Sequence, residues 1–282
     1  MRTFAAVSTC HAAGYETYGR QMLATFERHW PAEVPLLFYT EGFTADVASP
    51  RILCRDLAER CPDLMSFKAR HADNPLARGA TRRIRPRLSF HPRYPYLRLR
   101  GLKWGRGYRW NAVRVAHKTF ALFDAARTTD ADVLIWVDAD SLFFADVTPR
   151  DLEALIPPDC FVGYLRRDIH SECGFVAYNL RHPATRTLLE RFERLYREDT
   201  LFAEYEFHDS YLFDVVRRQV EREGHKSYDI AQGIGLRASH VLINSTLGRF
   251  MDHIKGGRKA LGGSHRSDLI VERPEPYWQA KR

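Results

Sequence analysis

Five apolar residues, Val133 to Val137, run directly into two aspartates, Asp138 and Asp140. The run has no polar alternation and is too short for a helix, so it predicts a strand that is covered on both faces, as in α/β sheets. Residues two apart in an extended backbone point to the same side. Asp138 and Asp140 can therefore turn both carboxylates toward one point, and the small Ala139 keeps the gap between them narrow.

This pair of carboxylates predicts a divalent-metal site. Ligands of open α/β sheets gather outside the carboxyl ends of the strands, which is where Asp138 and Asp140 would lie. Two hard oxygen donors suit Mn²⁺ or Mg²⁺, and these ions commonly keep substrate phosphates as further ligands. The competing interpretation is that an aspartate after a strand only caps the next turn.

The rest of the chain predicts alternating strands and helices. Phe4 to Val7 predicts a first strand, and Ser8 to His11 a loop after it that could hold a nucleotide. A helix from about Gly14 to Trp30 and a strand from Val34 to Tyr39 complete a β-α-β unit. Later strands are predicted at about 142–144, 161–165 and 172–179, and helices at about 111–127, 183–198 and 209–221, with Thr148 and Pro149 as a further helix entrance. The pattern indicates an α/β fold of one domain or two small ones.

Composition narrows the classes of partner. The 282-residue chain carries a formal charge of +8 and has a pI near 9.3, which favours a nucleotide, an acidic glycan, a phospholipid surface or nucleic acid. Its five cysteines are an odd set without a C-x-x-C pair, so reduced thiols in the cytoplasm are the simplest interpretation. The sequence shows neither a signal-peptide pattern nor an apolar run of ~20 residues, so membrane contact would be peripheral, at the inner face.

A basic, aromatic-rich insertion is predicted at about 75–110, within the least regular part of the sequence, Asp46 to Gly107. Lysine and arginine are frequent from 78 to 118, while no acidic residue occurs between Asp73 and Asp124. Three interpretations compete: a solvated basic loop, a site for an acidic acceptor or an anionic surface, and a nucleic-acid surface whose aromatic rings stack on bases. Prolines in the insertion disfavour a continuous helix.

The carboxy-terminal segment, about 245–282, is rich in glycine and cations. In the stretch from Lys255 to Lys259, the backbone N–H groups of Gly256 and its neighbour can turn toward a diphosphate while the cations balance its charge. The imidazole of His253 would complete a Mn²⁺ site, although a single histidine is more often structural.

Two further positions each allow two interpretations. Gly174, near the start of a predicted strand, either lets a substrate approach the backbone closely or marks a bulge. Asp209, at the start of a predicted helix, either serves as an N-cap carboxylate or accepts a proton from a hydroxyl nucleophile.

Taken together, these features resemble the landmarks of GT-A fold glycosyltransferases, which transfer a sugar from a nucleotide-diphosphate donor to an acceptor hydroxyl. The resemblance covers roughly 1–10 and 112–265, and it implies a single GT-A-like domain over 1–282 with a Rossmann-like, mixed and mostly parallel sheet flanked by helices. The matching residues are Asp138-Ala139-Asp140 for the D-x-D motif, Gly174 for the donor-side glycine, Phe207-His208-Asp209 for the x-E-D position, and His253-x-x-Gly256-x-x-Lys259 for the H-x-x-G-x-x-K signature of glycogenin-like retaining enzymes.

The resemblance implies a role for each residue of the site. Mn²⁺ or Mg²⁺ would be held by Asp138, Asp140 and His253 against the diphosphate of a donor, most often a UDP-sugar. The residues expected to bind the donor are Ser8, Thr9, Asp138, Gly174, Lys255, Gly256 and Lys259. The acceptor would be a glycan, a lipid-linked glycan or a protein, and the basic insertion favours an acidic one.

The stereochemical course stays open. In an inverting enzyme Asp209 would deprotonate the acceptor hydroxyl, whereas in a retaining enzyme Asp209 or Glu172 would position substrates. His208 stands where the family usually has an acid, and Ala260-Leu261 replaces the usual Pro-Trp. Two other functions compete with sugar transfer: a nucleotidyltransferase that makes nucleotide sugars, and a non-enzymatic nucleic-acid-binding protein built around 78–118.

Overall fold

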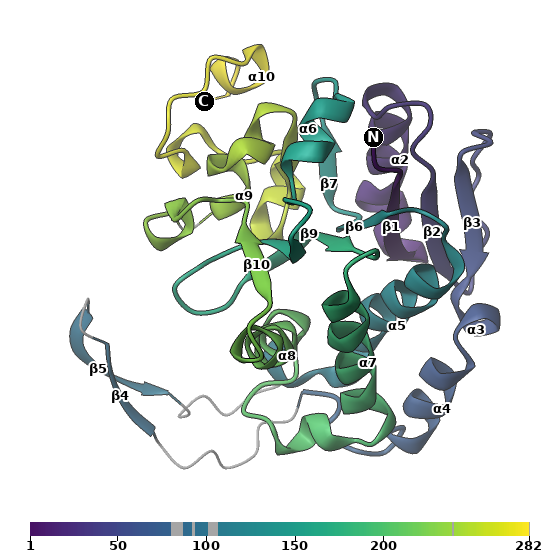
Figure 1. The fold of residues 1–282 in the computed structure, drawn as a ribbon, viewed down its shortest axis with the longest axis vertical. Coiled ribbons are helices and arrows are strands. Elements are labelled where there is room, and N and C mark those ends of the chain that lie inside the picture. Colours follow the sequence, from purple (N-terminus) through teal and green to yellow (C-terminus); the bar gives the residue numbers. More distant parts are fainter. Residues whose placement is uncertain (80–86, 92–93, 101–106, 239, 282) are drawn as a thin grey trace.

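A seven-stranded sheet forms the centre of the computed structural model, which describes residues 1–79, 87–91, 94–100, 107–238 and 240–281 (Figure 1). Four neighbouring pairs are parallel, namely β1–β2, β2–β3, β1–β6 and β8–β10, and two pairs, β6–β9 and β8–β9, are antiparallel. The prediction of an α/β fold with a mixed, mostly parallel sheet is therefore confirmed. In spatial order the strands are β10 (Lys226–Asp229), β8 (Cys160–Leu165), β9 (Glu172–Asn179), β6 (Val133–Val137), β1 (Phe4–His11), β2 (Leu36–Glu41) and β3 (Ile52–Asp56).

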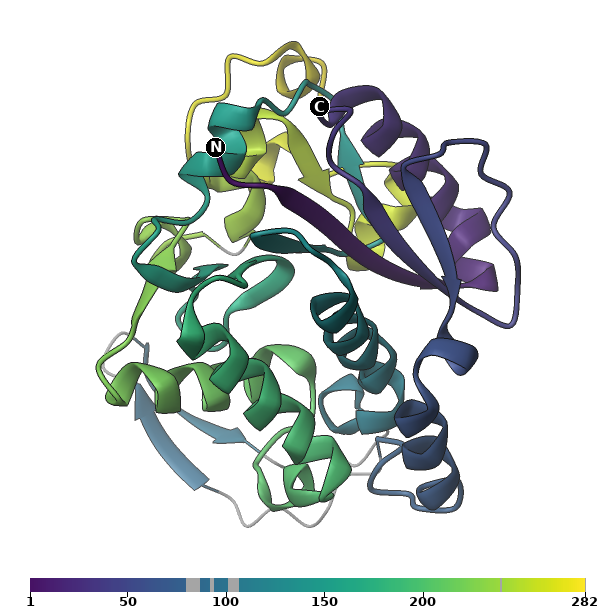
Figure 2. The same cartoon turned by 45° about the vertical axis from the view of Figure 1, so that its right-hand side comes forward.

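Helices cover both faces of this sheet and give the protein two hydrophobic cores. On one face, α2 contributes Met22 and Phe26, and Trp278 of α10 closes the same core. On the other face, α4, α5, α7 and α8 pack together (Figure 2). From α5, Phe120 and Phe123 contact Tyr196 and Phe192 of α7 in this second core. The helices are α1 (Ala12–Gly14), α2 (Arg20–His29), α3 (Leu57–Arg60), α4 (Pro62–Arg70), α5 (Ala112–Thr128), α6 (Pro149–Ala154), α7 (Pro183–Arg197), α8 (Asp209–Arg222), α9 (Val241–Asn244) and α10 (Pro276–Gln279).

The apolar run that opened the sequence analysis is strand β6, and all five of its residues are buried. It lies between β1 and β9, so its two edges are both paired and its two faces meet the two cores. A run without polar alternation suits this position because neither face meets water. The Thr148–Pro149 helix entrance is also confirmed: Thr148 caps α6 and forms a capping box with Asp151.

The prediction of a loop at Ser8 to His11 was wrong. These residues continue β1, because β2 runs on to Glu41 and pairs with β1 as far as His11. The helix that follows begins at Ala12 rather than Gly14, and a π-helical turn, Tyr15–Gly19, interrupts it before α2. An added Cβ at Gly14 would lie 2.4 Å from the Tyr18 hydroxyl, so glycine there lets the ring of Tyr18 lie against the first turn.

The segment from Asp46 to Gly107 is more regular than predicted. It contains β3, α3 and α4, and Asp56 caps α3 by accepting a hydrogen bond from the Glu59 amide. Within the insertion, the described backbone forms a separate antiparallel pair, β4 (Arg87–His91) with β5 (Tyr94–Arg100), away from the main sheet in Figure 1. The basic and aromatic side chains between 80 and 106 lie outside the described residues, so the three interpretations of this insertion stay predictions.

A small two-stranded sheet connects the carboxy-terminal segment to the end of β6. In this sheet β7 (Ser141–Phe143) pairs with β11 (Met251–His253), and His253 lies opposite Ser141. Short 3₁₀ turns make up much of the chain around it, at Tyr108–Trp110, Thr200–Ala203, Ile234–Leu236, Thr246–Arg249, Gly256–Leu261 and Arg266–Asp268. No helix in the described part of the chain is both long and apolar enough to cross a membrane.

Candidate metal and donor site

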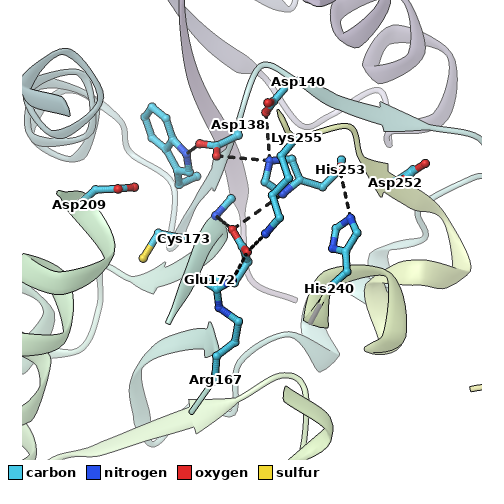
Figure 3. Close-up of polar contacts among 12 residues, drawn as sticks. Asp138, Asp140, Arg167, Glu172, Cys173, Asp209, His240, Asp252, His253 and Lys255 are labelled. Atoms are coloured by element: carbon cyan, nitrogen blue, oxygen red, sulfur yellow. Dashed lines mark hydrogen bonds and ion pairs between the residues drawn. The ribbon is translucent and has the colours of Figure 1, made fainter. Parts of the chain in front are cut away.

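Asp138, Asp140 and His253 come together at the carboxyl end of β6. Asp138 follows the strand directly, and Asp140 is held against β11 because its carbonyl accepts a hydrogen bond of 2.8 Å from the Ile254 amide. His253 Nε2 lies 3.0 Å from Asp140 Oδ1 and 3.6 Å from Asp138 Oδ2 (Figure 3). The predicted metal ligands therefore share one point, although Asp140 and His253 are 113 residues apart in the chain.

The geometry of these three side chains fits a divalent cation. One ligand atom from each residue lies within 4.8 Å of the others. Ligands that bind an octahedral ion at right angles, with bonds of about 2.1 Å, lie about 3 Å apart, close to the separations seen here. Two carboxylates and one imidazole are donors that Mn²⁺ accepts, and Mg²⁺ accepts the oxygens. Asp138, Asp140 and His253 can thus hold such an ion and leave positions for a substrate.

Charges around Asp140 and His253 stabilise each other. Burial alone would raise the pKa of Asp140, but His253 and Lys259, whose Nζ lies 2.9 Å from Asp140, hold that pKa well below its usual range. For His253 the effects have the opposite sign: burial lowers its pKa, but the carboxylates of Asp140, Glu172 and Asp138 outweigh burial and raise the pKa. The carboxylates and cations of the site are therefore paired with one another. A bound cation and an anionic substrate would exchange these partners.

The position of His253 depends on the residues packed around its ring. An added Cβ at Gly174 would lie 2.4 Å from His253 Cε1, so the imidazole occupies the space that a side chain at 174 would need. On the other side, His240 Nε2 donates to the carbonyl of His253 at 3.1 Å. Burial first, and then the nearby cations, lower the pKa of His240 to about 4, which keeps its ring neutral. Gly174 of β9 thus leaves room for the ring of His253, which comes from β11 of the small sheet.

Glu172, the first residue of β9, adds a buried carboxylate beside the half-buried Asp138 and Asp140. It accepts from Lys255 and from Arg167, whose Nη1 lies 3.2 Å away, and it lies 3.9 Å from His253 Nδ1 (Figure 3). These cations hold the pKa of Glu172 well below its usual range despite its burial. A carboxylate with such partners stays ionised and is a weak base.

Lys118 connects the metal group to Asp209, and its role was not predicted from the sequence. From α5 its ammonium contacts Asp138 at 2.7 Å, Asp209 at 2.8 Å and the Cys173 carbonyl at 2.6 Å. Burial opposes the charge of Lys118, but Asp138 and Asp209 raise its pKa well above its usual value. Trp136 adds an indole N–H, 2.6 Å from Asp138. A lysine within the mostly apolar α5 was the only sequence signal.

Asp209 is the first residue of α8, and His208 occupies the N-cap position, so the interpretation of Asp209 as the N-cap was wrong. Burial raises the pKa of Asp209, but the paired ammonium of Lys118 outweighs burial and lowers it. Its side chain therefore belongs to the same charge network as Asp138. A partner that lowers a carboxylate's pKa also lowers its strength as a general base.

The residues predicted to bind a donor come from β1, from the metal group itself, from β9 and from the carboxy-terminal segment. Ser8 and Thr9 are part of β1; the Ser8 hydroxyl is buried without a hydrogen-bond partner among the described residues, and the Thr9 hydroxyl donates to the Tyr39 carbonyl at 3.0 Å. Lys255, Gly256 and Lys259 belong to the carboxy-terminal segment. Gly256 has φ +62°, and no described atom lies within 4 Å of the Cβ that it lacks, so its backbone is open to an approaching ligand.

Two residues that the sequence analysis did not single out, Cys10 and Tyr18, lie near Asp140 and Lys259. Burial and then Asp140 raise the pKa of the Cys10 thiol to about 12, so it stays protonated. Lys259 lies over the ring of Tyr18, 4.2 Å from its centroid, and the π-helical turn carries Tyr18 into this position. All five cysteines of the chain are free thiols, as the sequence predicted.

Comparison with known proteins leaves the family of this chain open. No protein-family model and no curated protein matches the sequence. Three solved structures with distant similarity are the glycosyltransferase GlyE of Streptococcus pneumoniae TIGR4 (10% identity, 82% of this chain and 46% of that chain, TM-score 0.42), mouse xyloside xylosyltransferase 1 (11%, 80% and 84%, 0.43) and the bifunctional glycosyltransferase WbbM (10%, 76% and 37%, 0.44). This chain spans less than half the length of GlyE and WbbM. Similarities at this level assign neither family nor activity.

Proposed function

We propose that the protein is a metal-dependent glycosyltransferase that moves a sugar from a nucleoside-diphosphate donor, by preference a UDP-sugar, to an acceptor hydroxyl. The observation that carries this proposal is the convergence of Asp138, Asp140 and His253 at the carboxyl end of β6, beside the open glycine backbone at 256. The resemblance of these residues to the D-x-D and H-x-x-G-x-x-K motifs supports it. Mn²⁺ or Mg²⁺ held there would neutralise charge on the departing diphosphate.

Lys255 and Lys259 are paired with carboxylates in this structure and could pair with a diphosphate instead. Lys259 is paired with Asp140 and Lys255 with Glu172. When a diphosphate and its cation arrive, Asp138 and Asp140 would turn to the cation, and the lysine ammonium groups would bind phosphate oxygens. Lys255 and Lys259 would then stabilise the leaving nucleoside diphosphate as its negative charge develops. Ser8 and Thr9 would contribute from the β1 side.

The charge network favours the retaining course. Asp209 is bound to Lys118 and has a lowered pKa, so it is poorly suited to take a proton from the acceptor. A retaining transfer needs no enzymic base on the attacking face, and Asp209 and Glu172 would then position substrates. Analysis of the product's anomeric configuration by NMR decides this point, and an inverted product would return Asp209 to the role of base.

The acceptor would enter beside Arg167. A polar cavity of about 450 Å³ adjoins this residue, and Arg166, Arg167 and Arg218 are among its lining side chains. Because Arg167 is also bound to Glu172, one side chain contacts both this cavity and the proposed donor site. The lining also includes Asp168, Asp214 and Glu221, and Asp214 and Glu221 pair with Arg217, so Arg166 and Arg167 are the cations that would meet an acidic glycan, lipid-linked or protein acceptor. A peripheral membrane location would be compatible with a lipid-linked acceptor.

The first test is thermal unfolding with nucleoside diphosphates and nucleotide sugars, each with and without Mn²⁺. A ligand at about a hundredfold excess over its dissociation constant should stabilise the native state by about 2.7 kcal/mol. A shift that requires Mn²⁺ and disappears in Asp140→Asn would support the proposal and identify the donor base. Absence of any shift at saturating concentrations would overturn it. Stabilisation only by a nucleoside triphosphate with a sugar phosphate, or salt-dependent binding of DNA or RNA, would indicate the two competing functions.

A further inference from the structure

Two histidines and a glutamate form a second cluster outside the proposed donor site. His170 lies in the turn before β9, and Glu206 and His208 lie in the segment that enters α8. Glu206 Oε2 is 3.2 Å from His170 Nε2 and 2.8 Å from His208 Nε2, and the two imidazole centroids are 5.0 Å apart. Glu206 is 1% exposed and His208 4% exposed. The three side chains therefore meet in the interior, with their donor atoms directed at one another.

The cluster has three possible ligand atoms, namely the two Nε2 atoms and Glu206 Oε2, but one hydrogen bond among them, between His208 and Glu206. Both imidazoles direct Nε2 at the same carboxylate oxygen, and His170 Nε2 is buried without a hydrogen bond to any described residue. Ligand atoms that bind a tetrahedral ion with bonds of about 2.0–2.1 Å lie about 3.3 Å apart. The separations in the cluster are close to this value. Two histidines and one glutamate are also a donor set that Zn²⁺ accepts, with a fourth position left for water or a substrate.

Surrounding residues hold the glutamate in place. Arg109 Nη1 lies 3.1 Å from Oε1 of Glu206, the oxygen that the imidazoles do not share. The carbonyl of Arg109 also accepts a hydrogen bond of 2.7 Å from the Phe207 amide, which fixes the chain between Glu206 and His208. Partners that bind the other atoms of a ligand and set its orientation are the usual second layer around a metal.

We propose that His170, Glu206 and His208 form a second divalent-cation site, of the zinc type, distinct from Asp138, Asp140 and His253. A cation bound there would join the turn before β9 to the entrance of α8. His208 Nδ1 lies 4.0 Å from Asp209 Oδ1, so the entrance of α8 also adjoins the charge network around Lys118. The proposal rests on the geometry of the cluster alone and does not depend on the sugar-transfer activity.

The test is a titration of the metal-free protein with Co²⁺, a spectroscopic substitute for zinc. Equilibrium dialysis counts the bound equivalents, and visible absorption distinguishes four-coordinate Co²⁺, which absorbs strongly, from six-coordinate Co²⁺. The wild type should bind two equivalents. His170→Gln should lose the strongly absorbing one, and Asp140→Asn should lose the other. His29→Gln is the matched control, because His29 lies on α2 and pairs only with the exposed Asp146 among the residues described.

Zn²⁺-dependent thermal stability provides the second measurement. Zn²⁺ should raise the melting temperature of Asp140→Asn, which keeps the second cluster, but not that of Asp140→Asn combined with His170→Gln. His170 is the decisive position because its side chain is partly exposed and its replacement should not prevent folding. Absence of the strongly absorbing equivalent from the wild type, or its persistence in His170→Gln, would overturn the inference and leave the proposed transferase untouched. Absence of the other equivalent alone would overturn only the transferase.

Discussion

Aspartates flank both ends of strand β6, Asp132 before it and Asp138 after it. The two ends differ in the residues that surround these aspartates. At the amino end, Asp132 accepts a hydrogen bond of 2.8 Å from the Thr3 amide and pairs with the largely exposed Arg181. These contacts fasten the start of β1 to β6. At the carboxyl end, Asp138 and Asp140 face Lys118 from α5 and His253 and Lys259 from the carboxy-terminal segment.

The difference shows what distinguishes a binding site from a structural contact. Both ends have buried or half-buried carboxylates, and at both ends these carboxylates have hydrogen-bond or ion-pair partners. The amino end has a single carboxylate, with a backbone donor that cannot be displaced. The carboxyl end gathers Asp138, Asp140, Glu172 and Asp209 around side-chain cations that a ligand can replace. Convergence of several like charges, at a cost in desolvation, is typical of sites that bind something.

The largest expected effect comes from removing the cation shared at the carboxyl end. Lys118→Met would remove the ammonium that pairs with Asp209 and would leave Asp138 with the Trp136 indole and the more distant His253, so the free energy of unfolding should fall by about 3–5 kcal/mol in urea denaturation. Arg181→Met is the matched change at the amino end. Because Arg181 is 71% exposed, it should cost at most about 1 kcal/mol. Equal losses for the two variants would contradict the comparison.

The next effect is on metal affinity and uses the same substitution at both ends. Asp140→Asn should weaken Mn²⁺ binding at least about a hundredfold, or about 2.7 kcal/mol, because it removes a charged ligand. Asp132→Asn should leave Mn²⁺ affinity unchanged, since Asp132 lies at the other end of β6. Calorimetric titration measures both. Wild-type affinity in Asp140→Asn would show that the carboxyl end, like the amino end, is only structural.

A substitution at Gly174 tests how tightly the carboxyl end is packed. In Gly174→Ala the new methyl group would meet the imidazole of His253, so unfolding should become easier by about 1–3 kcal/mol and Mn²⁺ affinity should fall with it. Gly257→Ala is the control, because no described atom lies within 4 Å of its missing Cβ. Chemical denaturation and Mn²⁺ titration provide the two measurements. A Gly174→Ala protein with normal metal affinity would mean that His253 is not a ligand.

The smallest effect concerns the amino end alone and depends on pH. Burial opposes ionisation of Asp132, but the Thr3 amide and Arg181 lower its pKa below the unfolded value of about 3.9. Its contribution is therefore complete above about pH 4 and is lost as pH falls through the folded pKa. Asp132→Asn should cost about 1 kcal/mol at pH 7, with the difference from wild type shrinking below pH 4. A difference that grows in acid would reverse this assignment.

Local patterns predicted the parts of this molecule that local forces determine. The run from Val133 to Val137 marked a doubly covered strand, and the capping box at Thr148 depends only on neighbours in the chain. Asp138 and Asp140 do converge as predicted, but not through the period of a strand: β6 ends at Val137, and the two aspartates lie in a turn closed by a hydrogen bond of 3.1 Å from the Ser141 amide to the Asp138 carbonyl. The failure at Ser8 to His11 has a non-local cause, because the length of β1 is decided by the partner strand β2.

Tertiary contacts account for what the sequence did not reveal at the candidate site. Lys118 lies on α5, and nothing near it in the sequence indicates that it would bridge Asp138 and Asp209. The three residues His170, Glu206 and His208 come from two separate connections, so no spacing rule unites them. The space beside Gly174 is filled by a ring that lies far along the chain. These contacts join residues that are distant in the sequence, so they depend on how the sheet arranges the loops and helices between its strands.

The short pairing of β7 with β11 also governs which side chain the carboxyl end receives. Its three residue pairs place His253 opposite Ser141, whereas Asp252 points the other way and is bound by Ser264 and Tyr277. Because side chains alternate along a strand, a slip of one residue would replace the imidazole with a carboxylate. That slip would add negative charge where Asp138 and Asp140 already repel each other. The same two aspartates thus penalise the wrong alignment and help the last segment of the chain to dock in only one way.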